Sequence, residues 1–493
     1  MRWIAVLLLS QALAAAPPLK PRMDRLLDSS PAARRAYWGV HVVDLASGKT
    51  LYARNDDRFF VPASNTKLFS TALALLRLGP EHRFRTLVVA EKAPDAAGCV
   101  AGDLVLYGGG DPTLSGRPLP YRKNAASGDP LGPIEELAGQ VAARGVRRIE
   151  GDLVGDDTAY LWDPYPAGWA QSDTIWEYGA PVSALTVNDN TLALSIRPGA
   201  QAGDPARLEQ SPPLVHYQIE NRVRTVERGE RKIRIDRPAG SREVRVWGSI
   251  PRGDAGTTQL LAIDDPALFA ALALREALER KGIGVRGRAV ARHRAIDEVE
   301  DPAQGVASAA PAGVELARRE SAPLLETLRV VNKISQNLQA ELVLREVGRV
   351  RRGVGSRQAG LEELKAMLAE AGAAKEDYHF EDGSGLSRLT LITPALATRL
   401  LRFVWRSPHG ADWVTLLPVG GEDGTLASRF EGQPSASRIH AKTGSLSHVS
   451  ALSGYIERAG KPALAFSVIV NNYNSPPSET RRVIDRIGLL LAE

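Results

Sequence analysis

The stretch "FFVPASNTKLFSTALALLRLGP", residues 59–80, marks the point where an extended segment turns into a helix. Its apolar residues recur at helical spacing after Pro62 and the pattern ends at Gly79, so a helix is predicted between these two residues. Ser64 and Lys67 lie at its beginning, three positions apart, where side chains can touch. The spacing raises the question of whether these two side chains react together.

A serine hydroxyl becomes a nucleophile when an adjacent neutral amine removes its proton. A helix N-terminus adds backbone N–H groups and the positive end of the helix dipole, which stabilise a developing oxyanion. Ser64 with Lys67 fits this arrangement, but a capping serine beside a solvated lysine explains the same residues. Because S-x-x-K arises by chance about once in a chain of this length, the pair needs support from the rest of the sequence.

The two ends of the chain supply the strands of one predicted sheet. Residues 37–61 are predicted as strands with a tight turn at "ASGK". Near the C-terminus "RIHAKTGSL", "VSALSGYIE" and "ALAFSVIVNN" follow as further strands, before a last helix. Helices are predicted within 321–348 and 357–372. The sequence therefore predicts an α+β fold, with an antiparallel sheet completed by both termini beside a helical region.

The middle of the chain consists of short β-like runs divided by Gly, Asp and Pro. At 493 residues, more than one domain is expected. We predict an interrupted first domain, a β-rich second domain inserted in it, and a third domain nested in the second. Their predicted bounds are 24–83 with 307–493, 84–192 with 251–306, and 193–250.

The composition excludes several classes of protein. Cys99 is the single cysteine, so an intramolecular disulfide is impossible. The eight histidines show no zinc-ligand spacing, so no metal or other cofactor is predicted. The formal net charge of +5 is mild, and no basic and aromatic pattern indicates nucleic-acid binding.

The first residues, "MRWIAVLLLSQALAAAPPLK", have the layout of a secretory signal: one basic residue, a short apolar run and then small residues. Residues 1–16 are predicted to be this signal peptide. The apolar run is too short to span a bilayer and no later segment is long enough, so no transmembrane anchor is expected. The mature protein is predicted to be exported and soluble, in the periplasm or associated with the cell wall.

Two further short motifs follow at long intervals. Ser335, Gln336 and Asn337 lie at a predicted helix–helix junction, where a second hydroxyl can pass on a proton and an amide can orient a substrate. "KTGS", residues 442–445, lies in a predicted strand of the terminal sheet. Its lysine and hydroxyls suit a carboxylate, its glycine lets a substrate backbone approach the strand edge, and the N–H beyond that glycine can complete an oxyanion hole.

S-x-x-K, S-x-N and K-T-G, in this order and each on the expected element, resemble the class C low-molecular-mass penicillin-binding proteins. These are the D-alanyl-D-alanine carboxypeptidase/endopeptidases of peptidase family S13. The resemblance covers nearly the whole chain, and the long interval between the first two motifs fits the inserted domains of that family. It includes "YGGGDPTL" (107–114), "YGAPVSALTVNDN" (178–190), "EDGSGLSR" (381–388) and "LPVGGEDGTL" (417–426).

The resemblance implies a transpeptidase-like domain that cleaves after a D-alanine of peptidoglycan. Ser64 would attack the D-Ala carbonyl while Lys67 takes its proton, and Ser335 would help to pass that proton to the departing amine. Water would then hydrolyse the acyl-enzyme, whereas β-lactams would acylate the same serine and leave slowly. Gln336 stands where many relatives carry Asp, which leaves these roles intact.

The same resemblance implies a substrate-binding groove. Asn337 would position the peptide, and Lys442 and Thr443 would engage its terminal carboxylate. The N–H groups of Ser64 and Ser445 would hold the oxyanion. Gly444 would let the substrate backbone lie close to the edge of the strand.

Further residues are predicted at the edges of this groove. Ser384, Gly385 and Leu386 would form a wall of the cleft, and Arg388 would contact the stem peptide. Asp163 is predicted to bind a side-chain amine of the stem peptide, although a packed loop between domains explains that segment equally well.

Two other functions remain open from the sequence. A β-lactamase would share the acylation step, but it needs a dedicated deacylation base that no motif assigns. A non-catalytic wall-binding or penicillin-sensing module is the second alternative. The balance between terminal trimming and cross-link cleavage, the diamino acid accepted and the oligomeric state are all left undetermined.

Overall fold

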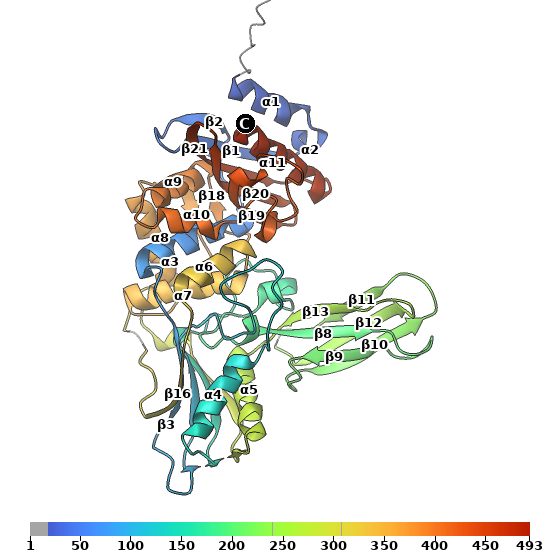
Figure 1. Ribbon diagram of the computed structural model, residues 1–493, viewed down its shortest axis with the longest axis vertical. Helices are drawn as coiled ribbons and strands as arrows, with labels where there is room; N and C mark the ends of the chain where they lie inside the picture. The colour runs from blue at the N-terminus through green and yellow to red at the C-terminus, as the bar shows by residue number, and fades with distance from the viewer. Residues whose placement is uncertain (1–17, 239, 307) are drawn as a thin grey trace, which may run out of the picture.

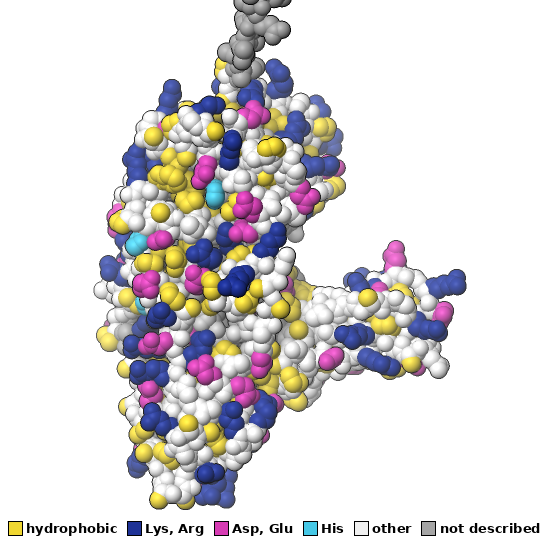
Figure 2. All heavy atoms as spheres, in the orientation of Figure 1, with side chains coloured by type: hydrophobic (Ala, Val, Ile, Leu, Met, Phe, Trp, Pro, Cys, Tyr) yellow, Lys and Arg dark blue, Asp and Glu magenta, His cyan; other side chains and the backbone are white. Residues whose placement is uncertain are grey.

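The computed structural model describes residues 18–238, 240–306 and 308–493, and the predicted signal peptide lies outside them. The molecule has an upper body built from both chain ends and a helical layer, a lower body, and a long β-projection on one side (Figure 1). In the space-filling view the projection stands free of the upper body, with a hollow between them (Figure 2). Of the described helices, none is long and apolar enough to cross a membrane.

Both chain ends contribute to one antiparallel sheet, which confirms the predicted fold class. Its elements and covering helices are β1 Tyr37–Asp44, β2 Thr50–Arg54, β19 Ile439–Leu446, β20 Val449–Arg458, β21 Lys461–Asn471, α1 Leu19–Ser29, α2 Pro31–Arg34, α9 Pro394–Trp405 and α11 Pro477–Ala492. The strand order is β19-β20-β21-β1-β2, so β19 is an edge strand. The helices α1, α2 and α11 pack on one face of this sheet and α9 packs on the other.

A helical layer follows beneath the sheet (Figure 1). Its elements are the 3-10 turn η1 Ala63–Asn65, α3 Thr66–Leu78, α6 Leu324–Lys333, α7 Asn337–Arg352, α8 Arg357–Glu370, α10 Gly410–Leu416 and the short pair β17 Tyr378–His379 and β18 Leu391–Ile392. Every residue from Thr66 to Leu75 is buried, because α3 is surrounded by the sheet and by the other helices. The helix predicted after Pro62 is thus the central helix of the domain.

The lower body contains the segments for which an insertion is predicted. Its elements are β3 Arg85–Ala90, β4 Cys99–Val100, β5 Leu104–Gly108, α4 Gly132–Ala143, β6 Arg148–Ile149, β7 Leu153–Leu161, α5 Pro266–Arg280, β14 Gly284–Val285, β15 Ala289–Arg294 and β16 Val314–Glu320. The main sheet has the order β15-β7-β5-β3-β16. Because β16 pairs antiparallel with β3, residues 314–320 belong to the insertion, beyond the predicted bound of 306.

The projection consists of β8 Thr191–Arg197, β9 Arg207–Ser211, β10 Gln218–Val226, β11 Lys232–Asp236, β12 Glu243–Pro251 and β13 Thr257–Ala262. These strands form two small sheets with the orders β10-β12-β11 and β13-β8-β9. Because β13 pairs with β8, the projection runs to Ala262 rather than to residue 250. We propose the domain bounds 18–84 with 321–493, 85–190 with 263–320, and 191–262.

Candidate active site

Ser64 lies in η1, the turn that leads from the sheet into α3. Asn65 donates from Nδ2 to the carbonyl of Lys442 at 2.9 Å, which ties the start of α3 to strand β19. On another side Gly385, at φ 78°, packs so closely that a Cβ there would lie 1.9 Å from the Ala63 carbonyl oxygen. The turn that carries Ser64 is therefore held in place both by the sheet and by the loop around Gly385.

Lys67 is fully buried and its ammonium nitrogen lies next to Ser64. Nζ is 2.9 Å from Ser64 Oγ, 2.6 Å from Asn337 Oδ1 and 2.7 Å from the Ser384 carbonyl oxygen. The amide and carbonyl oxygens can only accept hydrogen bonds. In the neutral amine, the two hydrogens therefore point to these oxygens and the lone pair faces the Ser64 hydroxyl. This is the geometry that a general base needs.

The pKa of Lys67 suits a general base. Burial lowers the pKa of Lys67 to about 7, and the negative charges of Asp382 and Glu341 oppose that shift. Burial, together with the charge of Lys67, also lowers the pKa of Lys442 well below its ordinary value. Near neutral pH a substantial fraction of Lys67 is uncharged, as a proton acceptor must be.

Asn337, the first residue of α7, is fixed through its other amide atom. Its Nδ2 donates to the carbonyl of Tyr178 at 2.7 Å, which leaves Oδ1 facing Lys67. Tyr178 belongs to the lower body, so the insertion sets the orientation of this amide.

Ser335 occupies the junction between α6 and α7, as predicted. Its backbone is left-handed, at φ 65°, which is unusual for a residue with a side chain. Lys442 Nζ donates to Ser335 Oγ at 2.8 Å and to the Thr443 carbonyl at 2.9 Å. The second and third motifs therefore meet directly, and the Asn65 bond to the Lys442 carbonyl joins them to the first.

The third motif lies on the edge strand β19. Lys442 is buried, Thr443 is half-buried with its hydroxyl 2.8 Å from that of Thr425, and Ser445 is exposed. A Cβ on Gly444 would lie 2.6 Å from the Pro62 carbonyl oxygen. The glycine is thus required for close packing of β19 against the segment that carries Ser64, which differs from the predicted reason of access for a substrate backbone.

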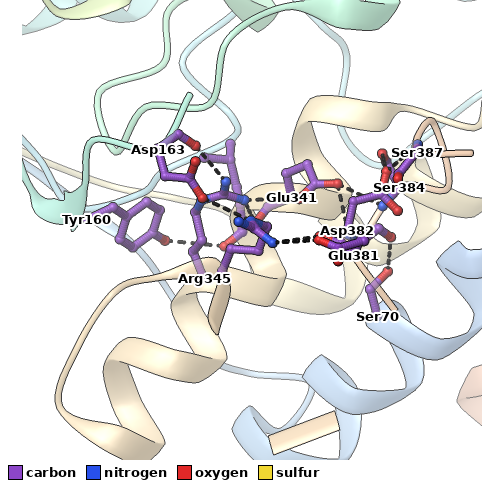
Figure 3. A network of polar contacts seen from close by, with 12 residues as sticks. Ser70, Tyr160, Asp163, Glu341, Arg345, Glu381, Asp382, Ser384 and Ser387 are labelled. Carbon is purple, nitrogen blue, oxygen red and sulfur yellow. Dashed lines mark hydrogen bonds and ion pairs between the residues drawn. The ribbon is translucent and has the colours of Figure 1, made fainter. Parts of the chain in front are cut away.

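The segment 382–388 lies behind Lys67 and partly departs from the prediction. Ser384 is fully buried and its hydroxyl donates to Asp382, so its side chain faces the protein interior rather than a cleft (Figure 3). Its carbonyl oxygen contacts Lys67 instead. Leu386 is buried, and the exposed Arg388 reaches the Ser447 carbonyl at 3.3 Å, in the turn after β19.

Asp163 does not offer a free carboxylate. Its Oδ2 is 2.9 Å from Arg357 Nε, and its carbonyl accepts from Arg345 at 2.9 Å. These bonds join the loop of the insertion to α7 and α8 (Figure 3). The alternative of a packed interdomain loop therefore describes Asp163, and we do not retain it as a substrate-binding residue.

No role was predicted from the sequence for Tyr178 or Asp173. Tyr178, whose carbonyl contacts Asn337, is 41% exposed. Its hydroxyl lies 3.5 Å from Asp173 Oδ1. "YGAPVSALTVNDN", residues 178–190, is one of the segments that carry the family resemblance, but only the fold shows that its first residue reaches the site.

Taken together, the site holds a hydroxyl beside a buried amine and a second hydroxyl beside a second lysine. Such a site belongs to the class of serine acyl-transfer enzymes. Within the residues that the structure describes, no cluster of three or more His, Cys, Asp or Glu side chains is placed to hold a metal.

Comparison with known proteins identifies the family. The chain matches the D-Ala-D-Ala carboxypeptidase 3 (S13) family over residues 19–493. It is 37% identical to the D-alanyl-D-alanine carboxypeptidase of Actinomadura sp. (strain R39), over 96% of this chain and 84% of that protein. It is 24% identical to the D-alanyl-D-alanine carboxypeptidase DacB of Haemophilus influenzae, over 87% of this chain and 84% of that one. The chain therefore belongs to the D-Ala-D-Ala carboxypeptidase 3 (S13) family.

The fold agrees with this assignment. The crystal structure of penicillin binding protein 4 (dacB) from Haemophilus influenzae superposes with a TM-score of 0.80 at 22% identity, over 95% of this chain and 98% of that one. A second structure of that protein, complexed with a β-lactam, gives a TM-score of 0.75 over the same shares of the two chains.

Proposed function

We propose that this protein is a serine DD-peptidase that hydrolyses D-Ala-D-Ala termini, or D-Ala-linked cross-links, of peptidoglycan through an acyl-enzyme on Ser64. Family membership and relatives named D-alanyl-D-alanine carboxypeptidase support the reaction class. The observation that carries the assignment to residues is the 2.9 Å contact between Lys67 Nζ and Ser64 Oγ, made by a lysine that is fully buried.

In the acylation step, Ser64 Oγ attacks the D-Ala carbonyl carbon and its proton passes to the lone pair of Lys67. As the C–N bond breaks, the proton held by Lys67 passes through the Ser335 hydroxyl to the leaving amine, which returns Lys67 to its neutral form. Lys442 holds Ser335 by a 2.8 Å hydrogen bond. Water then attacks the ester carbonyl and gives a proton to Lys67, which passes it to Ser64 Oγ as the C–O bond breaks and the acid leaves. No cofactor is required by this sequence of steps.

In the proposed substrate complex, the exposed edge of β19 receives the substrate. Lys442 and Thr443 attract its terminal carboxylate, and the N–H groups of Ser64 and Ser445 hold the oxyanion. Asn337 orients the peptide, and Arg388 contacts the stem peptide.

We propose that Asp173, and not Asp163, binds an amine on the substrate side chain. The exposed Tyr178 contacts Asn337 through its backbone carbonyl, and its hydroxyl lies 3.5 Å from Asp173 Oδ1. An aromatic face with a carboxylate suits a cation. This pair is proposed to recognise the diamino acid of the stem peptide.

Incubation of the purified chain with a D-Ala-D-Ala-ended peptide and with labelled penicillin tests the proposal. We expect D-Ala release, a persistent adduct on Ser64, and loss of both in Ser64→Ala. Rapid turnover of the drug would favour the β-lactamase alternative, and D-Ala release by Ser64→Ala would refute the assignment. Export to the wall is a separate part of the proposal, checked by locating the protein in fractionated cells.

A further inference from the structure

A buried turn, residues 382–385, supplies the carbonyl that contacts Lys67, and it is organised by carboxylates that the proposed reaction does not use (Figure 3). Glu341 Oε1 accepts from the backbone N–H groups of Gly383 at 2.9 Å and of Ser384 at 2.8 Å. Both Glu341 and Asp382 are fully buried.

Glu341 lies one helical turn after Asn337 on α7, so both residues project from the same face of the helix. Asn337 contacts Lys67 directly, and Glu341 reaches it through the Ser384 carbonyl. The other carboxylate oxygen of Glu341 is 2.9 Å from Arg345 Nη1, which fixes the direction of the side chain.

Asp382 also stabilises the turn, by accepting hydrogen bonds from uncharged donors. Its oxygens accept from the N–H groups of Gly385 at 3.0 Å and Ser387 at 2.8 Å, and from the Trp169 indole at 3.0 Å. Trp169 belongs to the insertion, so the network continues from the catalytic domain into the lower body.

We propose that Glu341 is a positioning residue for the base of the reaction, holding the 383–384 turn so that the Ser384 carbonyl directs the Lys67 lone pair at Ser64. This inference rests on the proposed function. It adds a second effect of the same side chain, because a negative charge near Lys67 favours the ammonium form.

The charged groups that surround Lys67 come from several elements. Glu341 on α7 and Asp382 in the turn favour a charge on Lys67, and Arg345 pairs with Glu341 at 2.9 Å. A charge on Lys67 in turn lowers the pKa of Lys442 on β19. Removing the charge of Glu341 while keeping its shape therefore lowers the pH at which Lys67 loses its proton.

The test measures the second-order rate of acylation by a fluorescent penicillin from pH 5 to 9, on the full chain. In Glu341→Gln we expect the acid limb of the pH profile, where the acylation rate rises with pH, to move to lower pH by about one unit. The plateau should fall about tenfold, because the amide cannot satisfy both the turn and Arg345. Glu341→Asp keeps the charge but shortens the reach, so its plateau falls while its acid limb stays at the wild-type pH.

Glu346→Gln is the matched control. Glu346 is also fully buried on α7 and pairs with Arg349 at 2.7 Å, and its hydrogen bonds go to other parts of the protein than the 382–385 turn. We expect its acid limb and plateau, measured per folded molecule, to match the wild type.

The possible outcomes distinguish failure of the proposed function from failure of the positioning role of Glu341. Absence of acylation in the wild type would overturn the proposed function itself. If folded Glu341→Gln shows the wild-type pH profile of acylation, with the same plateau rate and the same acid limb, the positioning role is overturned. It is also overturned if Glu346→Gln loses as much plateau rate as Glu341→Gln and the acid limb of Glu341→Gln stays at the wild-type pH. If Glu341→Gln does not fold, Glu341→Asp decides, and a wild-type plateau in that variant overturns the inference.

Discussion

Charged side chains are buried and hydrogen-bonded around Lys67, whereas they are exposed to solvent on the β-projection. Around Lys67, the side chains of Lys442, Glu341 and Arg345 are at most 1% exposed and each is fixed by hydrogen bonds. On the projection, Arg245 and Glu220 approach to 3.8 Å with side chains 48% and 45% exposed. Lys and Arg side chains are spread along its visible face (Figure 2).

The contrast follows from solvation. Water screens an exposed ion pair, whose contribution to stability is typically about 0–1 kcal/mol. A buried charge interacts strongly with its neighbours and its pKa responds to each of them. A substitution near Lys67 should therefore alter reactivity, whereas the same kind of substitution on the projection should not.

The largest effect is expected from Lys67→Met, which keeps the volume of the side chain and removes the base. We expect the rate of acylation by penicillin to fall about a thousandfold. Stopped-flow fluorescence measures this rate, with the exposed Lys365→Met as the control that keeps the wild-type value. A loss of less than about tenfold would show that another group accepts the proton.

The pH dependence of the wild-type rate gives the next largest effect. Because burial lowers the pKa of Lys67 to about 7, the neutral base is present above this pH and disappears below it. The acylation rate should therefore rise as pH increases through about 7, and at pH 5 it should be about a hundredfold below its plateau. A rate independent of pH between 5 and 8 would contradict the assignment.

Gly385→Ala tests how tightly the turn of Ser64 is held. The residue has φ 78°, and a Cβ would lie 1.9 Å from the Ala63 carbonyl oxygen. We expect a loss of about 3 kcal/mol in the free energy of unfolding, measured by urea denaturation. The open Gly460, at φ 65° with nothing within 4 Å of its Cβ, is the control for backbone strain without a clash, and Gly460→Ala should cost about 1 kcal/mol.

The smallest effects compare the insertion with the projection. Trp169→Phe removes the indole donor to Asp382, and we expect a loss of about 1 kcal/mol in stability and an acylation rate a few-fold lower. Arg245→Gln on the projection should change stability by less than about 0.5 kcal/mol and leave the rate unaltered. Equal rates in the two variants would show that the insertion does not influence the base.

The sequence predicted the elements of the fold better than their partners. Local periodicity and turn residues placed the central helix and the strands of both chain ends, and the order of three motifs predicted which segments meet. The pairing of β16 with β3 and of β13 with β8 was missed, because a strand pattern indicates one buried face but not the strand beside it.

The same limit applies within the site. Ser64 and Lys67 are three residues apart, so their contact follows from helical spacing. Glu341 acts on a turn 42 residues further along the chain, and Asp163 finds its partner 194 residues away. A buried carboxylate on a helix and a polar residue in a loop carry no local sign of such partners, so the buried surroundings of Ser384 and the pairing of Asp163 with Arg357 were not predicted.

The pairing of Arg85 with Glu320 means that the chain leaves the catalytic domain and returns to it at neighbouring points. A short loop across this gap would close the catalytic domain, so the lower body and its projection are topologically separable from it. Chemically they are no longer separable, since the Tyr178 carbonyl and the Trp169 indole now belong to the surroundings of Asn337 and Lys67. A substitution in the insertion can therefore reach the proposed base through those two contacts, although it lies outside the catalytic domain.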